Sequence, residues 1–163
     1  MQTKAAIKAV LSYGSFLVSK YISDLEESEI LVRPAPSASH IAYQLGHLIV
    51  SEYNSMQCLA PGLSPALSEE FISAHAKENQ GSSSSELFYQ KNEYVELGEA
   101  QREATLGILQ SYDEDRLSDP GPEKMRSYAP TAGHVFIMQG VHQLNHSGQF
   151  VVVRRLLGKP VLI

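Results

Sequence analysis

Residues 141–149 read VHQLNHSGQ and place His142 and His146 four positions apart in a stretch with the pattern of a long helix. Four residues is just over one helical turn, so both imidazoles project from the same helix face and can reach one ion. A third histidine, His47, lies in the middle of another apolar helical segment. If these two helices pack side by side, the three rings meet at one depth. Three imidazoles without a nearby cysteine favour a divalent metal site that keeps an open coordination position.

Four long segments show the spacing of amphipathic helices. Apolar residues recur three and four positions apart, which predicts one buried face for each segment. Prolines and glycines separate the segments, and such residues interrupt helices. The expected helices are residues 3–25, a second from a cap at Ser37 or Ser39 to residue 59, residues 85–112, and residues 131–157 after a cap at Thr131, with a short candidate at 68–76 opened by Ser68.

These segments predict an all-α fold, since no stretch competes with the alternation of a strand. Helices of about 22 to 28 residues are rods of roughly 33 to 42 Å, the dimensions of a four-helix bundle. The short turn at residues 33–36 makes the first two helices antiparallel. The connector between the second and third helices has about 25 residues and can cross the whole bundle, so these two helices are free to run parallel. We expect one domain over residues 1–163.

Composition excludes several classes of protein. The formal net charge is −5, and the lysines and arginines are scattered apart from Arg154 and Arg155, so no basic surface for nucleic acid or an anionic membrane is expected. No segment approaches the ~18 consecutive apolar residues of a membrane span. The single cysteine, Cys58, allows no intrachain disulfide and fits a reducing compartment. A cytoplasmic protein is therefore expected.

The surroundings of the three histidines supply candidate acceptors for the second ring nitrogen that each ligating imidazole carries. Tyr43 lies one turn before His47, and Gln149 lies just under one turn after His146. Asn145 is a third candidate, and we expect the site to open to solvent on one side of the bundle. The alternative is that Tyr43 is an ordinary core residue and that Gln149 forms an interhelix hydrogen bond.

The remaining histidines are less suitable as ligands. His40 lies about 10 Å along its helix from His47, and His134 lies about 12 Å from His142, so neither can share the ion. His75, on the long connector, can fold back over the site, and that alternative stays open. Histidines on helix faces are also common as ordinary core or surface residues. On the third helix we expect four charged residues to face solvent: Glu93, Glu96, Glu99 and Arg102.

Two motifs resemble those of the DinB/YfiT-like metalloenzymes. One is His142-x-x-x-His146-x-Gly148-Gln149, followed by LGKP at 157–160, and the other is SHIAYQLGHL at 39–48. The resemblance covers nearly the whole chain and implies an up-down-down-up four-helix bundle with a divalent ion held by His47, His142 and His146. Two features depart from the family pattern. Ser147 stands where an arginine is frequent, and the aromatic residue before the second helix is absent.

The resemblance implies a metal-dependent enzyme. Relatives include thiol-dependent S-transferases and a mycothiol-dependent isomerase, in which the ion holds a low-molecular-weight thiol as thiolate. We therefore expect a Lewis-acid ion that activates a thiol toward a small-molecule substrate. The alternatives are a metal-dependent hydrolase and a non-catalytic bundle that binds a metal or a ligand. Zinc or nickel is expected, and iron is also compatible with imidazole ligands.

A homodimer is expected as well. This follows mainly from the resemblance, and closed two-fold dimers are the commonest oligomers. Phe71, Ile72, Leu87 and Phe88, in and beside the polar connector, are the apolar residues proposed for its surface.

Overall fold

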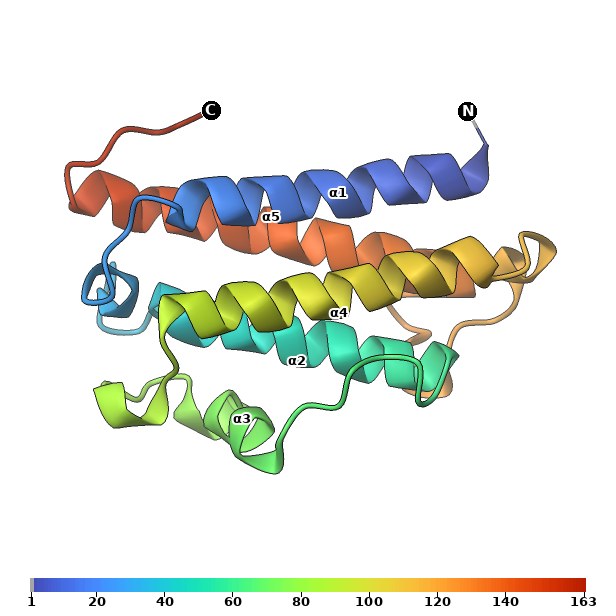
Figure 1. Cartoon of the computed structure of the whole chain (residues 1–163), viewed down its shortest axis with the longest axis horizontal. Coiled ribbons are helices and arrows are strands. Elements are labelled where there is room, and N and C mark those ends of the chain that lie inside the picture. Colours follow the sequence, from blue (N-terminus) through green and yellow to red (C-terminus); the bar gives the residue numbers. More distant parts are fainter. Residues whose placement is uncertain (1) are drawn as a thin grey trace.

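The computed structural model describes residues 2–163, and this part of the chain is helical, without strands beyond one isolated bridge between Pro120 and Thr131. Four long helices lie lengthwise against one another, and a short helix lies outside them (Figure 1). The all-α prediction is confirmed. The helices are α1 (Thr3–Ile22), α2 (Ile41–Leu59), α3 (Glu69–Ala74), α4 (Lys91–Ser111) and α5 (Ala132–Leu156), with short 3-10 turns at Glu29–Leu31, Lys77–Asn79, Ser85–Leu87, Asp115–Ser118 and Glu123–Met125.

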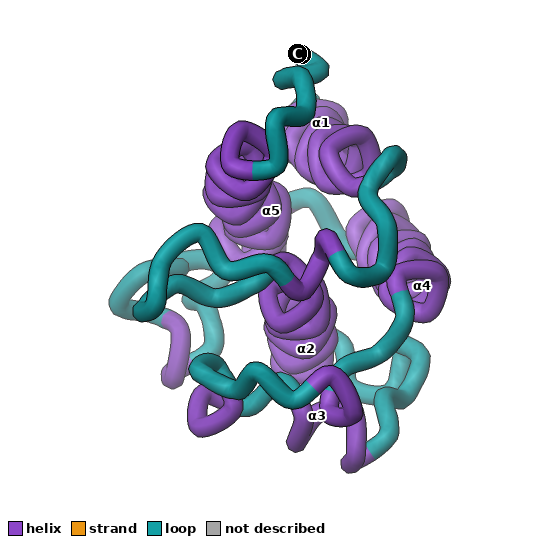
Figure 2. Tube along the Cα trace, turned by 90° about the vertical axis from the view of Figure 1, so that its left-hand side faces the viewer, coloured by secondary structure: helices purple, strands orange, loops and turns teal. Residues whose placement is uncertain are grey.

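The connection that contains α3 returns the chain along the length of the bundle (Figure 1). As the colours of Figure 1 show, α2 and α4 both run from left to right, whereas α1 and α5 run from right to left. The end view in Figure 2 shows α1 beside both α5 and α4, with α2 below them. None of the described helices is both long enough and apolar enough to cross a membrane.

The first residues of two helices differ from the sequence prediction. The cap of α2 is His40 instead of Ser37 or Ser39, because Nδ1 of His40 accepts a hydrogen bond from the Tyr43 backbone N–H at 3.0 Å. The helix expected from residue 85 begins as α4 at Lys91. There the Glu93 carboxylate accepts from the Gln90 backbone N–H at 2.9 Å, which stabilises this start in the manner of a capping box.

Two other caps are confirmed. The Ser68 hydroxyl accepts from the Phe71 backbone N–H at 3.1 Å and opens α3. The Thr131 hydroxyl accepts from the His134 backbone N–H at 3.4 Å and opens α5. Both hydroxyls satisfy N–H groups that have no partner inside a helix.

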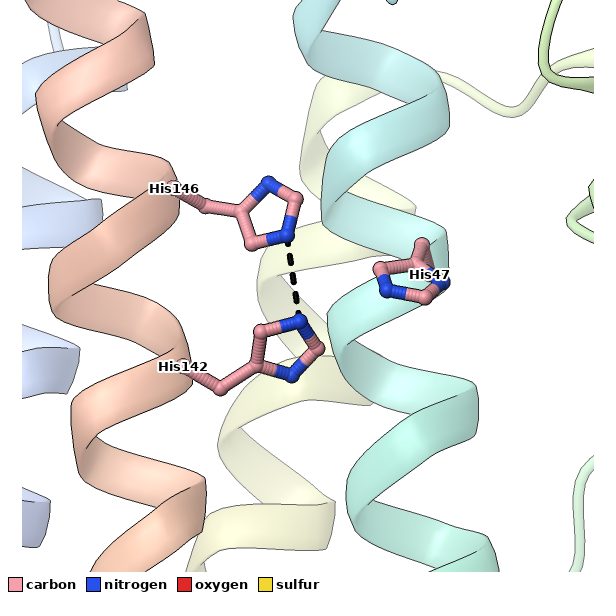
Figure 3. A group of neighbouring side chains, drawn as sticks. All are labelled: His47, His142 and His146. Atoms are coloured by element: carbon pink, nitrogen blue, oxygen red, sulfur yellow. Dashed lines mark hydrogen bonds between the residues drawn. The ribbon is translucent and has the colours of Figure 1, made fainter. Parts of the chain in front are cut away.

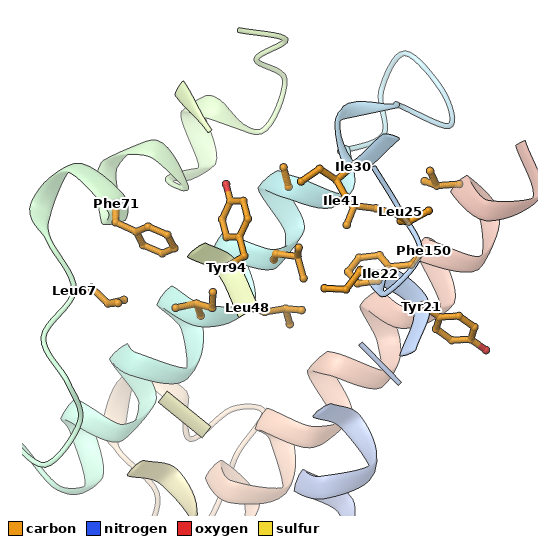
Figure 4. Packing of buried hydrophobic residues seen from close by; sticks show 14 residues of the cluster. Tyr21, Ile22, Leu25, Ile30, Ile41, Leu48, Leu67, Phe71, Tyr94 and Phe150 are labelled. Atoms are coloured by element: carbon orange, nitrogen blue, oxygen red, sulfur yellow. The ribbon is translucent and has the colours of Figure 1, made fainter. Parts of the chain in front are cut away.

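The apolar core includes α3 and the long connector. Figure 4 shows Phe71 and Tyr94 beside α2, and Ile22, Leu25 and Phe150 where α1 and α5 end. Phe71 is 1% exposed. Ile72 and Phe88 pack against the same cluster, so these residues belong to the chain's own core instead of an exposed dimer surface. The homodimer stays a prediction.

Arg102 differs from the sequence prediction. It is 5% exposed and faces inward, where its guanidinium donates two hydrogen bonds to the Glu52 carboxylate at 2.9 and 2.8 Å and one to the Leu11 carbonyl at 2.6 Å. A buried charge of this kind is tolerated when it is paired and its donors are satisfied. The pair joins α4 to α2 and, through Leu11, to α1.

Helices α1 and α5 approach each other through glycine. A Cβ atom at Gly140 would lie 2.7 Å from the Val10 carbonyl oxygen, and a Cβ at Gly14 would lie 2.8 Å from the Gly140 carbonyl oxygen. Both contacts are with backbone, which cannot rotate away as a flexible side chain does. The two glycines therefore set the distance between α1 and α5, and through it the position of the histidines on α5.

We expect Gly140→Ala to lower the free energy of unfolding by about 1–3 kcal/mol, because overpacking a tight contact outweighs the roughly 1 kcal/mol by which alanine favours a helix. Gly148→Ala, on the same helix, is the matched control, because a Cβ there meets nothing within 4 Å. Denaturant unfolding should give Gly148→Ala a free energy of unfolding equal to or above that of wild type. A Gly140→Ala variant as stable as wild type would contradict the close contact.

Candidate metal centre

The three histidines singled out in the sequence lie together between α2 and α5. One nitrogen from each of His47, His142 and His146 can be chosen so that all three atoms lie within 4.8 Å of one another. Figure 3 shows His142 and His146 one turn apart on α5, facing His47 across the gap to α2. The Nε2 atoms of His142 and His146 are 3.1 Å apart. All three rings are half-buried.

The ring of His146 is oriented by Gln44, a residue of α2. The Gln44 amide nitrogen donates to the Ser39 carbonyl at 2.9 Å, which directs its oxygen toward Nδ1 of His146 at 2.7 Å. An amide oxygen only accepts, so His146 carries its proton on Nδ1. The lone pair of His146 is then on Nε2, the atom that faces His142. Gln44 is 2% exposed, so water does not compete for this contact.

The imidazoles of the cluster are held in the neutral form. Burial, together with the neighbouring histidines, lowers the pKa of His142 and of His146 from 6.5 to about 4. Burial also lowers the pKa of His47. A ring without its second proton offers a lone pair, which is the state that binds a metal.

The donor set fits a divalent ion. Nitrogens at 2.0–2.1 Å from a tetrahedral ion are about 3.3 Å apart. His142 and His146 are already near that separation, at 3.1 Å. The ligating nitrogen of His47 lies within 4.8 Å of the nitrogens of the other two histidines, so a rotation of its side chain can bring it to the same separation. Among the described residues, no carboxylate or thiol joins this cluster, so three imidazoles are the protein donors on offer.

His75 packs against α2 at Gly46, and its ring forms hydrogen bonds with residues outside the cluster. Its Nδ1 contacts the Phe71 carbonyl at 2.8 Å and its Nε2 contacts the Tyr94 hydroxyl at 2.8 Å. Both ring nitrogens are therefore engaged. A Cβ at Gly46 would overlap this ring, so glycine is needed there for the connector to pack on α2. The alternative in which His75 joins the three histidines has no support in this geometry.

The three residues expected to surround the cluster, Tyr43, Asn145 and Gln149, make other contacts than the sequence suggested. The Tyr43 ring is nearly parallel to that of His47, with centroids 6.1 Å apart, and its hydroxyl donates to the Ala76 carbonyl at 3.5 Å. Asn145 and Gln149 are exposed. Within residues 2–163, none of these three side chains forms a hydrogen bond with the clustered imidazoles. The acceptor for the Nδ1–H group of His146 is Gln44 instead. Gln44 was not among the residues predicted from the sequence, although it lies three residues before His47 on α2.

A groove of about 710 Å³ opens onto the cluster, and both His47 and His142 line it. Val50, Met138 and Val141 give it apolar walls. Among the described lining residues, Lys124 is the only one with a charge at neutral pH. Cys58 lines the same groove and is exposed, but its thiol is outside the metal-ligating group. The cluster is therefore open to a small molecule from this side.

Comparisons with known proteins agree with this architecture. The family model described as the DinB superfamily matches residues 17–150. The crystal structure of a conserved protein from Enterococcus faecalis superposes with a TM-score of 0.74 at 16% sequence identity, over 98% of this chain and 99% of that chain. At this identity the similarity shows the fold alone. No curated protein matches the sequence.

We expect the metal-free protein to keep His142 and His146 neutral well below the ordinary histidine range, because burial lowers the pKa of both rings to about 4. The unfolded chain binds these protons near pH 6.5, so the fold loses stability as the pH falls from about 6.5 to 4. Nitrogen-detected NMR of the imidazoles measures both the titration and the tautomer. Titration of the pair near pH 6.5, or a His146 ring protonated on Nε2, would contradict the buried, Gln44-oriented arrangement.

Proposed function

The chain belongs to the DinB superfamily, and we propose that it is a divalent-metal-dependent enzyme whose ion is held by His47, His142 and His146. The proposed reaction is transfer of a low-molecular-weight thiol to an electrophilic small molecule. The observation that carries the proposal is the meeting of three neutral imidazoles from two helices beside a groove that two of them line. Zinc or nickel is the proposed ion, with iron as a further candidate, because imidazole suits all three.

The number of protein donors supports catalysis over a purely structural ion. Structural zinc sites are closed by four protein ligands, whereas catalytic sites have three and leave a position for water or substrate. His75, the fourth ligand considered from the sequence, is held by hydrogen bonds to Phe71 and Tyr94. The groove lies on the side of His47 and His142, where an exogenous ligand can reach the open position.

Residues of the groove have separate roles in this proposal. A thiol bound to a divalent ion loses its proton and becomes a nucleophile near neutral pH. Lys124, the single cation of the described lining, is suited to hold an anionic group of the thiol or of the substrate. Met138 and Val141 give one wall an apolar surface. Outside the groove, Gln44 fixes the His146 ring so that Nε2, which faces His142, would be available to hold an ion.

The proposal includes the connectivity of the bundle. An up-down-down-up order is supported by the directions of the long helices in Figure 1. In this order the long connection from the end of α2 to the start of α4 runs back along α2, and it contains α3 and His75. The connector thereby covers the face of α2 near His47 that α5 leaves uncovered.

A cobalt-substituted protein tests this function most directly. We expect about one cobalt ion per chain, and addition of a thiol should create a new sulfur–metal charge-transfer band. His47→Ala should lose the ion, because two imidazoles on one helix are left. His134→Ala is the matched control, since His134 is an exposed histidine of α5 outside the cluster.

The outcomes separate the alternatives. Equal cobalt binding by wild type and His47→Ala would exclude this metal site. A bound ion whose spectrum ignores thiols but shifts with pH would indicate a metal-bound water and a hydrolase. An ion that responds to neither would indicate a closed site without catalysis.

A further inference from the structure

A second cavity lies on the other side of α2, away from the three histidines. It has a volume of about 340 Å³ and lies between α1, α2, α4 and α5. Its lining shares no residue with the groove at the metal centre. Leu45, Leu48 and Ile49 of α2 form its floor, and each of them is 5% exposed or less. The site is therefore independent of the proposed metal chemistry.

The cavity exists because small residues face one another across it. Ser15 and Ser19 of α1 and Gly98 of α4 line the space. At Gly98 an added Cβ would lie 3.7 Å from Cγ1 of Ile49, which is ordinary contact distance. This differs from the α1–α5 contact, where an added Cβ at Gly140 would overlap backbone. Helix α1 thus lies tightly against α5 and leaves room on its side toward α4.

The size and walls of the cavity define what it can hold. An apolar cavity of about 150 Å³ binds one benzene molecule. A cavity of about 340 Å³ has room for two fused rings or an aliphatic chain of similar bulk. Protein cavities that bind small molecules have mainly apolar walls and few polar groups, as this one does.

The charges at the cavity select the polar end of the ligand. Glu99 and Glu103 line it from α4 and are exposed. No salt bridge of the described residues includes either carboxylate. Arg102 also lines the cavity, but its charge is paired with the Glu52 carboxylate, and three of its five N–H groups donate to Glu52 and the Leu11 carbonyl. Among the described lining residues, an anionic ligand therefore finds no unpaired cation, whereas a cationic group finds two carboxylates.

From these observations we infer that this cavity is a binding site for an apolar or aromatic amine, with the apolar body against Leu48 and Ile49 and the ammonium group beside Glu99 and Glu103. The amine is a ligand of the bundle and takes no part in the proposed thiol transfer. The floor of the cavity and His47 lie on different faces of α2, so this helix separates the cavity from the metal centre.

Naphthylmethylamine is a suitable probe, because the chain has no tryptophan to obscure naphthyl fluorescence. We expect the metal-loaded protein to bind it more tightly than the uncharged naphthylmethanol, and to bind naphthoate least. Glu99→Gln with Glu103→Gln should weaken amine binding about two- to fivefold, the usual size of an exposed charge interaction, and leave naphthylmethanol binding unchanged.

Filling the cavity is the direct test. Gly98→Leu should weaken binding of both naphthylmethylamine and naphthylmethanol at least about tenfold, because its side chain occupies the ligand volume. Gly107→Leu is the matched control on the same helix, since a Cβ there meets nothing within 4 Å and Gly107 is outside this cavity's lining. Metal content should remain at the wild-type value in both variants, which separates this site from the metal centre.

Three results would overturn the inference. One is wild-type protein that binds none of the naphthyl probes, and another is Gly98→Leu protein that binds them as wild type does. The third is a wild-type dimer, measured by light scattering, that Gly98→Leu converts to a monomer, because the cavity would then hold a second copy of the chain. If Gly98→Leu does not fold, Gly98→Ala replaces it, and its added carbon should weaken binding in the same direction.

Discussion

The hydrogen bond between Gln44 and His146 joins α2 to α5 at the depth where the three imidazoles meet. Because the Gln44 amide is itself held by the Ser39 carbonyl, the contact fixes the rotation of α2 as well as the tautomer of His146. A buried amide that lost this partner would pay the cost of an unsatisfied polar group. The same bond therefore stabilises the helix pair and directs the lone pair of His146 toward His142.

Helix α2 makes different contacts on each of its faces. His47 and Gln44 face α5, while Leu48 and Ile49 form the floor of the second cavity. One turn further on, Glu52 accepts two hydrogen bonds from Arg102 and connects α2 to α4. A buried carboxylate with a bidentate arginine allows little rotation of the helix. The positions of the histidines and of the cavity are thus set by the same helix.

The sequence predicted the part of the site that depends on helical spacing. The spacing of four positions from His142 to His146 places both rings on one face, and the central position of His47 places it at the same depth. The partner of His146 depends instead on the rotation of α2 about its axis, which tertiary packing determines, so spacing did not distinguish Gln44 from Tyr43. Gln149 is exposed because the histidines lie at the margin of the buried face of α5. That marginal position also leaves the site open to the groove.

The proposed metal centre has three imidazoles from two helices around one ion and leaves a coordination position open. X-ray absorption of the zinc-loaded protein measures this directly, because imidazole rings give characteristic multiple scattering. We expect three imidazole nitrogens at about 2.0–2.1 Å from the zinc ion, with at least one further oxygen from solvent. A zinc site with four protein ligands, or one with fewer than three imidazoles, would contradict it.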